Sequence, residues 1–324
     1  MAKRGWIKTP DQIKEFALQN EDISNKGAYQ NLMLQLSKAA KHSKGISITS
    51  QRQYYNHMDQ FCRFLADQFN LKKLANIKDK HVVAYVIDRQ SEGKSAAAIK
   101  QDLAAIRYFH DQQPETRNHL SDNKKLTKCF PEFKLQKRSF GGVDRRPTEF
   151  EYQSLLNIAK ASGRPEMAHI IQLAREQGGR VHEIVRLDRS DAEKALKEDF
   201  LTFKGKGGLV RKVPLREPVR EILKKAISGV GRGEKLFVAP QEKAHTVIQR
   251  VQDFIRTYRK KVYDPLNTRP SDVSVTIHSM RHAYAKEQYE GFISKGLTEK
   301  DARLETSYLI GHSREDITRI YLGE

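Results

Sequence analysis

The chain has 324 residues, enough for two domains of ordinary size. Its 59 lysine and arginine residues outnumber its 40 aspartate and glutamate residues, which gives a formal net charge of +19 at pH 7. This excess favours a polyanionic partner, with nucleic acid first and an anionic membrane surface second, and the sequence contains no apolar run of about 18 residues that would span a bilayer.

The first residues and the two cysteines indicate a protein of the cytoplasm. Residues 1–6 carry basic side chains, but no apolar segment follows them, so they lack the pattern of a secretory signal. Cys62 and Cys129 lie far apart and without the spacing of a zinc site, which favours reduced cysteines. Together with the positive charge, these features predict a cytoplasmic protein that associates with the nucleoid.

Residues 1–46 are predicted to form an N-terminal arm with one or two helices. Ile13, Phe16 and Ala17 share one face of the first helix. The rest of the segment is polar and basic, and a partly disordered tail is the alternative interpretation.

Residues 47–133 are predicted to form a small, all-helical domain. Ser95 has the position of an N-cap that begins one of its helices. The apolar residues of another helix recur every three or four positions, as expected for one buried face: Tyr54, Met58, Phe61 and Leu65.

Residues 134–147 are predicted to be a linker, because cationic side chains surround a Gly-Gly pair there. Thr148 and Glu151 then form a capping-box pattern that begins a new helix. A basic connector suits a protein that closes around a duplex, and residues 148–324 are predicted to be the second, catalytic domain.

Basic side chains of the helical domain and the linker exceed the acidic side chains near them, which favours contacts with DNA phosphates. The candidate DNA-binding residues are Lys72, Lys73, Lys94, Lys100, Arg107, Lys137, Arg138, Arg145 and Arg146.

The second domain is predicted to contain helices and one hairpin. Two β-rich segments, residues 200–203 and 210–215, flank a Gly-Lys-Gly-Gly turn, which is typical of two paired strands. A Gly-Gly pair at 178–179 interrupts an earlier helical pattern. Further helices are expected over residues 218–227, 244–263, 277–289, 299–310 and 314–321.

Four separated stretches of this domain carry side chains suited to phosphate chemistry. Such chemistry requires guanidinium groups for phosphate oxygens, groups that donate or take a proton, and a hydroxyl nucleophile. In chain order the candidates are Arg180 with Glu183, Lys206 in the hairpin turn, His278 with Arg281 and His282, and His312 with Tyr321 nine residues later.

In this order and context the stretches resemble the tyrosine recombinases, also called phage-type integrases. The resemblance is specific over residues 148–321 and looser over residues 47–112, and it covers nothing of residues 1–45. It implies a mainly α-helical fold with a small β-sheet, in which a helical DNA-clamping domain precedes an α+β catalytic domain. The matching segments are Gly179-Arg180-Val181-His182-Glu183-Ile184, Lys204-Gly205-Lys206-Gly207, His278-Ser279-Met280-Arg281-His282 and Leu309-Ile310-Gly311-His312.

The resemblance implies that Tyr321 attacks a DNA phosphate and forms a 3′-phosphotyrosyl link, which stores the energy of the broken bond. Tyr308 is the nearest rival nucleophile, but it precedes His312 instead of following it. The implied partner is double-stranded DNA, on which the chain would act as a homo-oligomer, a tetramer. No metal ion, no other cofactor and no membrane is expected.

The resemblance also assigns roles to the remaining residues. Arg180 and Arg281 would hold non-bridging phosphate oxygens. Lys206 would protonate the leaving 5′ oxygen, with Lys204 as the alternative acid. Glu183 would support the arginines as a structural buttress. The histidines have separate assignments: His278 hydrogen-bonds the phosphate or accepts the tyrosine proton, His312 donates to a non-bridging oxygen, and the role of His282 stays open.

Two features depart from the family pattern. Arg281 and His312 are 31 residues apart, a long spacing that predicts an extra loop over residues 291–296. The sequence also ends three residues after Tyr321, whereas many relatives carry a further element that docks on a neighbouring subunit. We therefore expect either another mode of association or a shortened sequence.

Three other classes of protein remain as alternatives. A type IB topoisomerase or a telomere resolvase would use the same tyrosine chemistry with a different outcome. A catalytically inactive DNA-binding protein would keep the fold alone. A metal hydrolase built on His278, His282 and His312 is disfavoured, because no acidic ligand accompanies them at the usual spacing.

Overall fold

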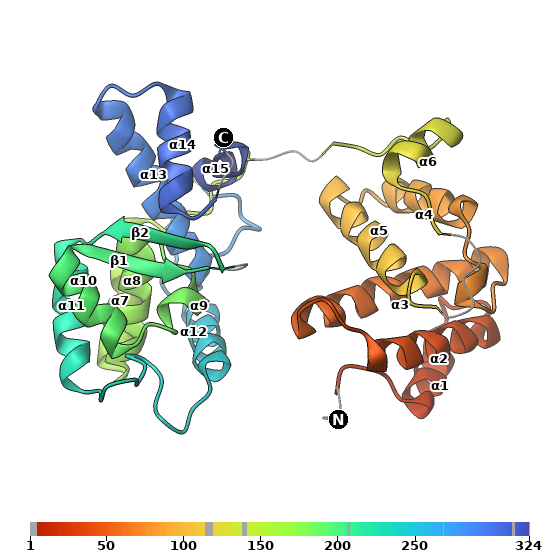
Figure 1. Ribbon diagram of the computed structural model, residues 1–324, viewed down its shortest axis with the longest axis horizontal. Coiled ribbons are helices and arrows are strands. Elements are labelled where there is room, and N and C mark those ends of the chain that lie inside the picture. Colours follow the sequence, from red (N-terminus) through yellow and green to blue (C-terminus); the bar gives the residue numbers. More distant parts are fainter. Residues whose placement is uncertain are drawn as a thin grey trace. The chain divides into compact units, whose positions relative to one another are not determined.

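The computed structural model describes residues 5–113, 119–137, 141–205, 208–267, 269–312 and 315–323. They divide into two compact units, Met1–Ser139 and Phe140–Glu324, each with its own hydrophobic core. The predicted fold class is confirmed, because regular structure in these ranges is mainly helical, with one two-stranded sheet (Figure 1). In the same ranges, no helix has the length and apolar character needed to cross a bilayer.

All regular structure in the described residues of the first unit is helical. Side chains at the N-caps begin several of these helices: Ser47 and Ser95, for example, each accept a hydrogen bond from a backbone N–H three residues on. The elements are α1 Pro10–Gln19, α2 Lys26–His42, α3 Ile48–Phe69, the 3₁₀ helix Leu74–Asn76, α4 Asp79–Ser91, α5 Ala96–His110 and α6 Asn123–Cys129.

The helices α1 and α2 are part of the core of the first unit. Ile13 and Ala17 of α1 and Tyr29 and Leu32 of α2 are at most 1% exposed and join the same cluster of side chains as α3 and α5. Burial of this kind gives about 1.5–3 kcal/mol for each large apolar side chain. The boundary between an arm and a helical domain near residue 46 stays a prediction.

Buried carboxylates tie the helices of this unit together. Asp102 of α5 is 1% exposed, lies 2.5 Å from His57 Nδ1 of α3, and accepts from Arg89 Nε of α4 at 3.3 Å. A buried carboxylate without partners would cost several kcal/mol, so this group fixes α3, α4 and α5 relative to one another.

The second unit begins with the predicted capping box. Thr148 Oγ1 accepts from the backbone N–H of Glu151 at 3.2 Å, and Glu151 Oε2 accepts from that of Thr148 at 2.9 Å. The elements that follow are α7 Glu149–Ala161, α8 Pro165–Gln177, α9 Val181–Ile184, α10 Arg189–Glu198, β1 Phe200–Lys204, β2 Val210–Pro214, α11 Glu217–Ser228, α12 Ala244–Tyr258, α13 Ile277–Ser294, α14 Glu299–Leu309 and α15 Glu315–Leu322.

The prediction of an extra loop over residues 291–296 is wrong for its first four residues. Helix α13 continues to Ser294, because Gly291 faces open space and the side chain of Phe292 still packs on a small cluster around Tyr289. The helix ends just before Gly296, whose φ of +88° is a conformation that favours glycine. The helices α13, α14 and α15 pack against one another, as Figure 1 shows.

The strands β1 and β2 form the predicted antiparallel hairpin. Leu201 lies opposite Val213, and Phe203 lies opposite Arg211, so both pairs face the same side of the sheet. That side is buried, with these four residues at most 7% exposed. An arginine therefore occupies an inward-facing position of the sheet.

Helix α8 ends at Gln177, and Gly178 follows as its C-cap. The conformation of Gly178 directs its own carbonyl into the interior. Its φ is +59°, and a Cβ atom there would lie 2.2 Å from a ring carbon of Tyr284 in α13. Glycine is required both for the backbone conformation and for the close packing of α8 on α13.

Candidate active site

Arg180 stands at the N-cap of the short helix α9, directly after the turn at Gly178 and Gly179. Its backbone N–H donates to Glu183 Oε2 at 2.8 Å, and its Nη1 donates to Glu183 Oε1 at 2.9 Å. Its other terminal nitrogen, Nη2, lies 3.3 Å from His312 Nε2. Its side chain is 22% exposed, so Arg180 is only partly buried.

Glu183 is buried between two arginines. Arg211 of β2 donates to it from both terminal nitrogens, at 2.9 and 2.7 Å, in addition to the contacts from Arg180. Burial by itself would raise the pKa of Glu183, but hydrogen bonds and positive charge from Arg211, and then from Arg180, lower that pKa to about 2. The carboxylate is therefore ionised at neutral pH and unsuited to carrying a proton.

Arg281 of α13 is completely buried. Its terminal nitrogens donate to the backbone carbonyls of Gly178 and Ile310. Among the described residues it has no carboxylate partner, and its guanidinium carbon lies 5.4 Å from the ring centre of Tyr321. Burial, and then the charges of Arg180 and Arg211, outweigh the opposing effect of Tyr321 and lower the pKa of Arg281 to about 10, so it remains charged at neutral pH.

Three imidazoles surround the ring of Tyr321, which is 6% exposed on α15. The ring centres of His278, His282 and His312 lie 5.5, 4.6 and 5.5 Å from that of Tyr321. The Tyr321 hydroxyl is 3.2 Å from His312 Nε2. His282 is 2% exposed, and its Nδ1 has no hydrogen-bond partner among the described residues.

All three imidazoles are neutral at pH 7. Loss of hydration among packed side chains, followed by the nearby arginines, lowers the pKa of His278 and of His312 to about 4. Loss of hydration and the neighbouring His278 lower the pKa of His282 to about 3. His278 is exposed at the surface, and any lowering of its pKa from the ordinary 6.5 leaves its imidazole mostly neutral at pH 7.

The structure thus brings together most of the residues that the sequence predicted for the site. They come from three of the four stretches and are Arg180, Glu183, His278, Arg281, His282, His312 and Tyr321. Lys206 lies outside the described residues. The rival nucleophile Tyr308 is 54% exposed on α14.

The root of the turn that carries Lys206 lies next to this cluster. Gly205 donates from its N–H to the Leu209 carbonyl at 2.7 Å, and a Cβ atom on Gly205 would lie 3.2 Å from Glu183 Oε1 and 3.8 Å from Arg180 Nη1. The alternative acid, Lys204, has a side chain that is 72% exposed and lies 3.5 Å from Asp191.

Several candidate DNA-binding residues are exposed: Lys72, Lys73, Lys94, Lys137 and Arg145. Lys100 is half-buried, and Arg138 lies outside the described residues. Two of the candidates make bonds within the chain, because Arg107 donates to the Ser121 carbonyl at 2.9 Å and Arg146 pairs with Asp144 at 2.7 Å.

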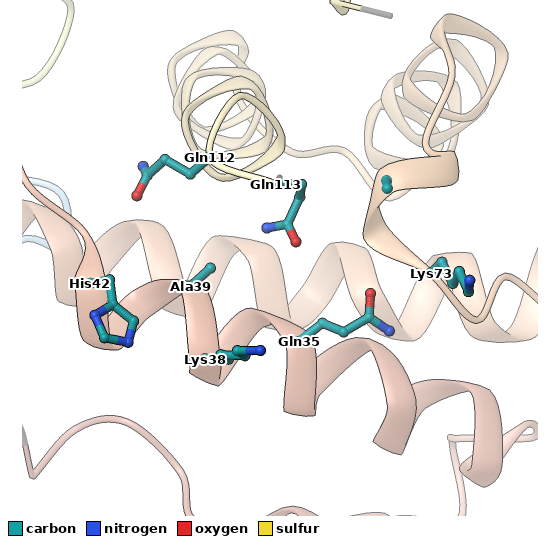
Figure 2. A pocket seen from close by; sticks show the side chains of 8 residues that line it. Gln35, Lys38, Ala39, His42, Lys73, Gln112 and Gln113 are labelled. Carbon is teal, nitrogen blue, oxygen red and sulfur yellow. The ribbon is translucent and has the colours of Figure 1, made fainter. Parts of the chain in front are cut away.

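A cavity of about 590 Å³ in the first unit contains none of the predicted catalytic residues (Figure 2). Six of its eight lining residues have polar or basic side chains, among them one candidate DNA-binding residue, Lys73. The lining residues are Gln35, Lys38, Ala39, His42, Lys73, Ala75, Gln112 and Gln113.

Sequence reasoning missed Arg211, which contacts Glu183 as closely as Arg180 does. A signal was present, because Arg211 and Val213 are two positions apart in a strand and must face the same side. Within the described ranges, no group of His, Cys, Asp and Glu residues is arranged to hold a metal ion.

Comparisons with known proteins agree with this geometry. A model of the phage integrase family matches residues 145–323, and a model of the N-terminal SAM-like domain of phage integrases matches residues 35–112. The chain is similar to the tyrosine recombinase XerD of Oceanobacillus iheyensis, with 23% identity over 286 residues that cover 86% of this chain and 88% of the relative.

Two solved structures share the fold. One is a lambda integrase tetramer bound to a Holliday junction, with a TM-score of 0.57 and 19% identity, which covers 89% of this chain and 76% of that chain. The other is the Tn1549 transposon integrase in complex with transposon right end DNA, with a TM-score of 0.55 and 14% identity, which covers 89% of this chain and 93% of that chain.

The chain belongs to the phage integrase family. The resemblance to tyrosine recombinases that the four motifs predicted is confirmed, and the chain is an enzyme of the class that breaks and rejoins DNA strands.

We predict that Glu183→Gln lowers the free energy of unfolding at pH 6 by about 3 kcal/mol, because a pKa lowered from 4.5 to about 2 corresponds to a free energy of this size. The ionised carboxylate stabilises the fold above pH 4.5, and this contribution disappears as the pH falls through 2. The difference between the two proteins should therefore shrink to less than half at about pH 3.

Denaturant unfolding followed by circular dichroism measures this difference. The single tryptophan, Trp6, lies in the first unit, so its fluorescence reports separately on that unit and should not change. A difference that stayed constant between pH 6 and pH 3 would contradict the assignment of an ionised, buried Glu183.

Proposed function

We propose that this chain is a site-specific recombinase that cuts DNA through a 3′-phosphotyrosyl intermediate on Tyr321 and serves the integration or excision of a mobile element. The observation that carries the proposal is the convergence of two arginines, Arg180 and Arg281, with a buried tyrosine and neutral imidazoles. These residues come from three stretches that are far apart in the sequence.

The charge of this cluster supports phosphate as its ligand. Arg180, Arg211 and Arg281 contribute three positive charges and Glu183 one negative charge, which leaves a net charge of +2 on these four side chains. A phosphodiester carries one negative charge, and the pentacoordinate state formed on attack carries a second. Preorganised cations are most effective where charge develops during the reaction.

Arg180 and Arg281 would hold the two non-bridging oxygens of the scissile phosphate. The Arg180 side chain is partly exposed, whereas Arg281 is completely buried and the centre of the Tyr321 ring lies 5.4 Å from its guanidinium carbon. We therefore expect Tyr321 to move when DNA binds, so that the phosphate reaches Arg281 and the hydroxyl comes into line for attack.

His312 is our candidate for the base that takes the proton of Tyr321. A guanidinium only donates hydrogen bonds, so the contact of Arg180 Nη2 with His312 Nε2 requires a free lone pair on that nitrogen. The Tyr321 hydroxyl lies 3.2 Å from the same nitrogen. After accepting the proton, Nε2 becomes a donor that can bind a non-bridging phosphate oxygen.

The phosphate itself would make His312 basic enough for this step. The pKa of His312 is lowered by loss of hydration and then by Arg281 and Arg180. A bound phosphate offsets these positive charges and raises that pKa. Tyr321 would then lose its proton only when DNA occupies the site, which protects the free enzyme from unproductive ionisation.

Lys206 is proposed to complete the reaction. As the bond from phosphorus to the 5′ oxygen breaks and the bond to the Tyr321 oxygen forms, the Nζ of Lys206 would give its proton to the departing oxygen. The position of Gly205 beside Arg180 supports this role, and the pairing of Lys204 with Asp191 makes Lys204 the less suitable acid.

We assign DNA binding and DNA cleavage to different predicted domains. We propose that residues 47–133 and the basic linker 134–147 clamp the duplex, while residues 148–324 carry out cleavage and residues 1–46 form an adjoining arm. The chain would act as a tetramer in the cytoplasm, on DNA of the nucleoid. The candidate phosphate contacts are Lys72, Lys73, Lys94, Lys100, Arg107, Lys137, Arg138, Arg145 and Arg146.

We predict that Tyr321→Phe abolishes covalent attachment to DNA while the fold and the affinity for DNA survive, because the substitution removes only the hydroxyl. The measurement incubates the protein with fragmented genomic DNA, separates covalent complexes under denaturing conditions and sequences the attached ends. Tyr308→Phe is the matched control and should attach DNA as the unaltered protein does.

Exchange between two copies of the recovered site would support recombination. Attachment that leads only to relaxation of single plasmids would instead assign the chain to the topoisomerase alternative, and full attachment by Tyr321→Phe would exclude this residue as the nucleophile.

We predict that His312→Ala slows cleavage by about 10²–10⁴-fold, the range typical of a general base. A fluorinated tyrosine at position 321, which ionises at lower pH, should restore much of the lost rate. The measurement is the single-turnover rate of covalent-complex formation on a duplex that contains the recovered site.

Two comparisons make this test specific. His278→Ala should gain nothing from the fluorinated tyrosine, and a gain there alone would move the base to His278. A substrate with sulfur as the 5′-bridging atom, which leaves without a proton, should restore cleavage by Lys206→Ala but not by His312→Ala.

A further inference from the structure

Arg211 is buried on the inner face of β2 and makes contacts with four parts of the second unit. It donates to both oxygens of Glu183, at 2.9 and 2.7 Å, and from Nε to the Leu309 carbonyl at 2.9 Å. Its Nη2 also lies 3.5 Å from the Gly178 carbonyl, and its guanidinium carbon is 4.7 Å from the ring centre of Phe203.

These contacts join the stretches that carry the site. Glu183 connects Arg211 with Arg180, and the Gly178 carbonyl also accepts a hydrogen bond from Arg281. Leu309 ends the helix α14, three residues before His312.

The chain just before His312 passes directly over the guanidinium of Arg211. Gly311 has a φ of +64°, and a Cβ atom there would lie 3.1 Å from both Cδ and Nη1 of Arg211. A side chain at position 311 would therefore press on the arginine, which shows how closely the segment from Leu309 to Gly311 is fitted to it.

We propose that Arg211 is a positioning residue for DNA cleavage: it fixes Glu183, and through it the guanidinium of Arg180, and it fixes the segment from Leu309 to Gly311 so that His312 reaches Tyr321. This inference rests on the proposed function of the same site.

Arg211 also anchors the hairpin that presents Lys206. Phe203, directly before the last residue of β1, lies opposite Arg211 in the sheet, and its ring lies beneath the guanidinium. Gly205, which follows β1 at the start of the turn, lies against Glu183, the carboxylate that Arg211 holds. The β1 end of the turn is thus held by contacts with Arg211 and its partner Glu183, while Arg211 itself lies in β2 one residue after the strand begins.

The geometry requires an arginine and not merely a positive charge. A guanidinium has five donors in a fixed plane, so that it can bind both oxygens of a carboxylate and a carbonyl at its other edge. A lysine keeps the charge but concentrates its donors at one point. Arg211→Lys therefore separates the positioning of neighbours from the electrostatic effect of the charge.

A second buried arginine in the same unit provides a matched control. Arg269 donates from Nη1 to Glu151 at 2.6 Å and to the Arg146 carbonyl at 2.7 Å, and its side chain is 3% exposed. It resembles Arg211 in burial and in having a carboxylate partner, but its hydrogen bonds go to Glu151 and the Arg146 carbonyl and not to Glu183, Gly178 or Leu309. Arg269→Lys should cost similar stability without affecting the site.

The test measures single-turnover cleavage by the full chain at saturating DNA, below the temperature at which either variant unfolds. Arg211→Lys should slow covalent-complex formation by about 100-fold, because a displacement of about 1 Å at a reacting group has an effect of this size. Its DNA affinity, and the cleavage rate of Arg269→Lys, should stay within about twofold of the unaltered protein.

A double-substitution cycle supplies a readout that a purely stabilising role would not change. Glu183→Gln and Arg211→Lys both act through Arg180, so the double variant should cleave no more than about twofold slower than the slower single variant. Independent, multiplying effects would contradict the coupling.

If Arg211→Lys does not fold, Phe203→Leu loosens the guanidinium while it keeps most of the core volume. Phe254→Leu, in the same core, is its control. Cleavage by Phe203→Leu at the rate of the control would then overturn the proposal. Cleavage by Arg211→Lys at the unaltered rate overturns it directly. If the unaltered protein forms no covalent complex at all, the proposed function fails instead.

Discussion

The candidate active site depends on a cluster of three arginines with a single carboxylate, Glu183, among them. All three guanidinium groups stay charged within the second unit. Glu183 satisfies Arg180 and Arg211, whereas Arg281 is held by the carbonyls of Gly178 and Ile310. Carbonyl dipoles at the end of a helix stabilise a cation without neutralising it. This arrangement requires a glycine at position 178, because its conformation turns the carbonyl toward Arg281 and allows α8 to pack against α13.

The excess positive charge of the three arginines affects the histidines beside it. It contributes to keeping His278 and His312 neutral, since their pKa values are lowered in part by Arg281 and Arg180. It also makes an anion the natural ligand, because burying like charges together costs free energy that a phosphate would offset. The excess positive charge thus favours binding of a DNA phosphate. In our proposal, it also makes the pKa of His312 depend on whether DNA is bound.

The sequence predicted the residues of the candidate active site better than the residues that hold them in position. The residue types and the order of the motifs were enough to predict that Arg180, His278, Arg281, His312 and Tyr321 lie together, because phosphate chemistry requires those residue types. Arg211 was missed because its role depends on strand register, and the end of α13 was missed because packing of Phe292 overrides the glycine at position 291. The DNA-binding candidates remain predictions, since surface lysines become informative only against a bound duplex.

The most direct test of the charge constraint is the pKa of His312, measured by NMR on protein labelled at the histidine rings and assigned with His312→Asn. We expect a pKa of about 4 in the free protein, lowered by burial beside Arg281 and Arg180, and a higher pKa when Tyr321→Phe binds an uncleaved DNA site. A value near 6.5 in the free protein, the ordinary value for histidine, would contradict it.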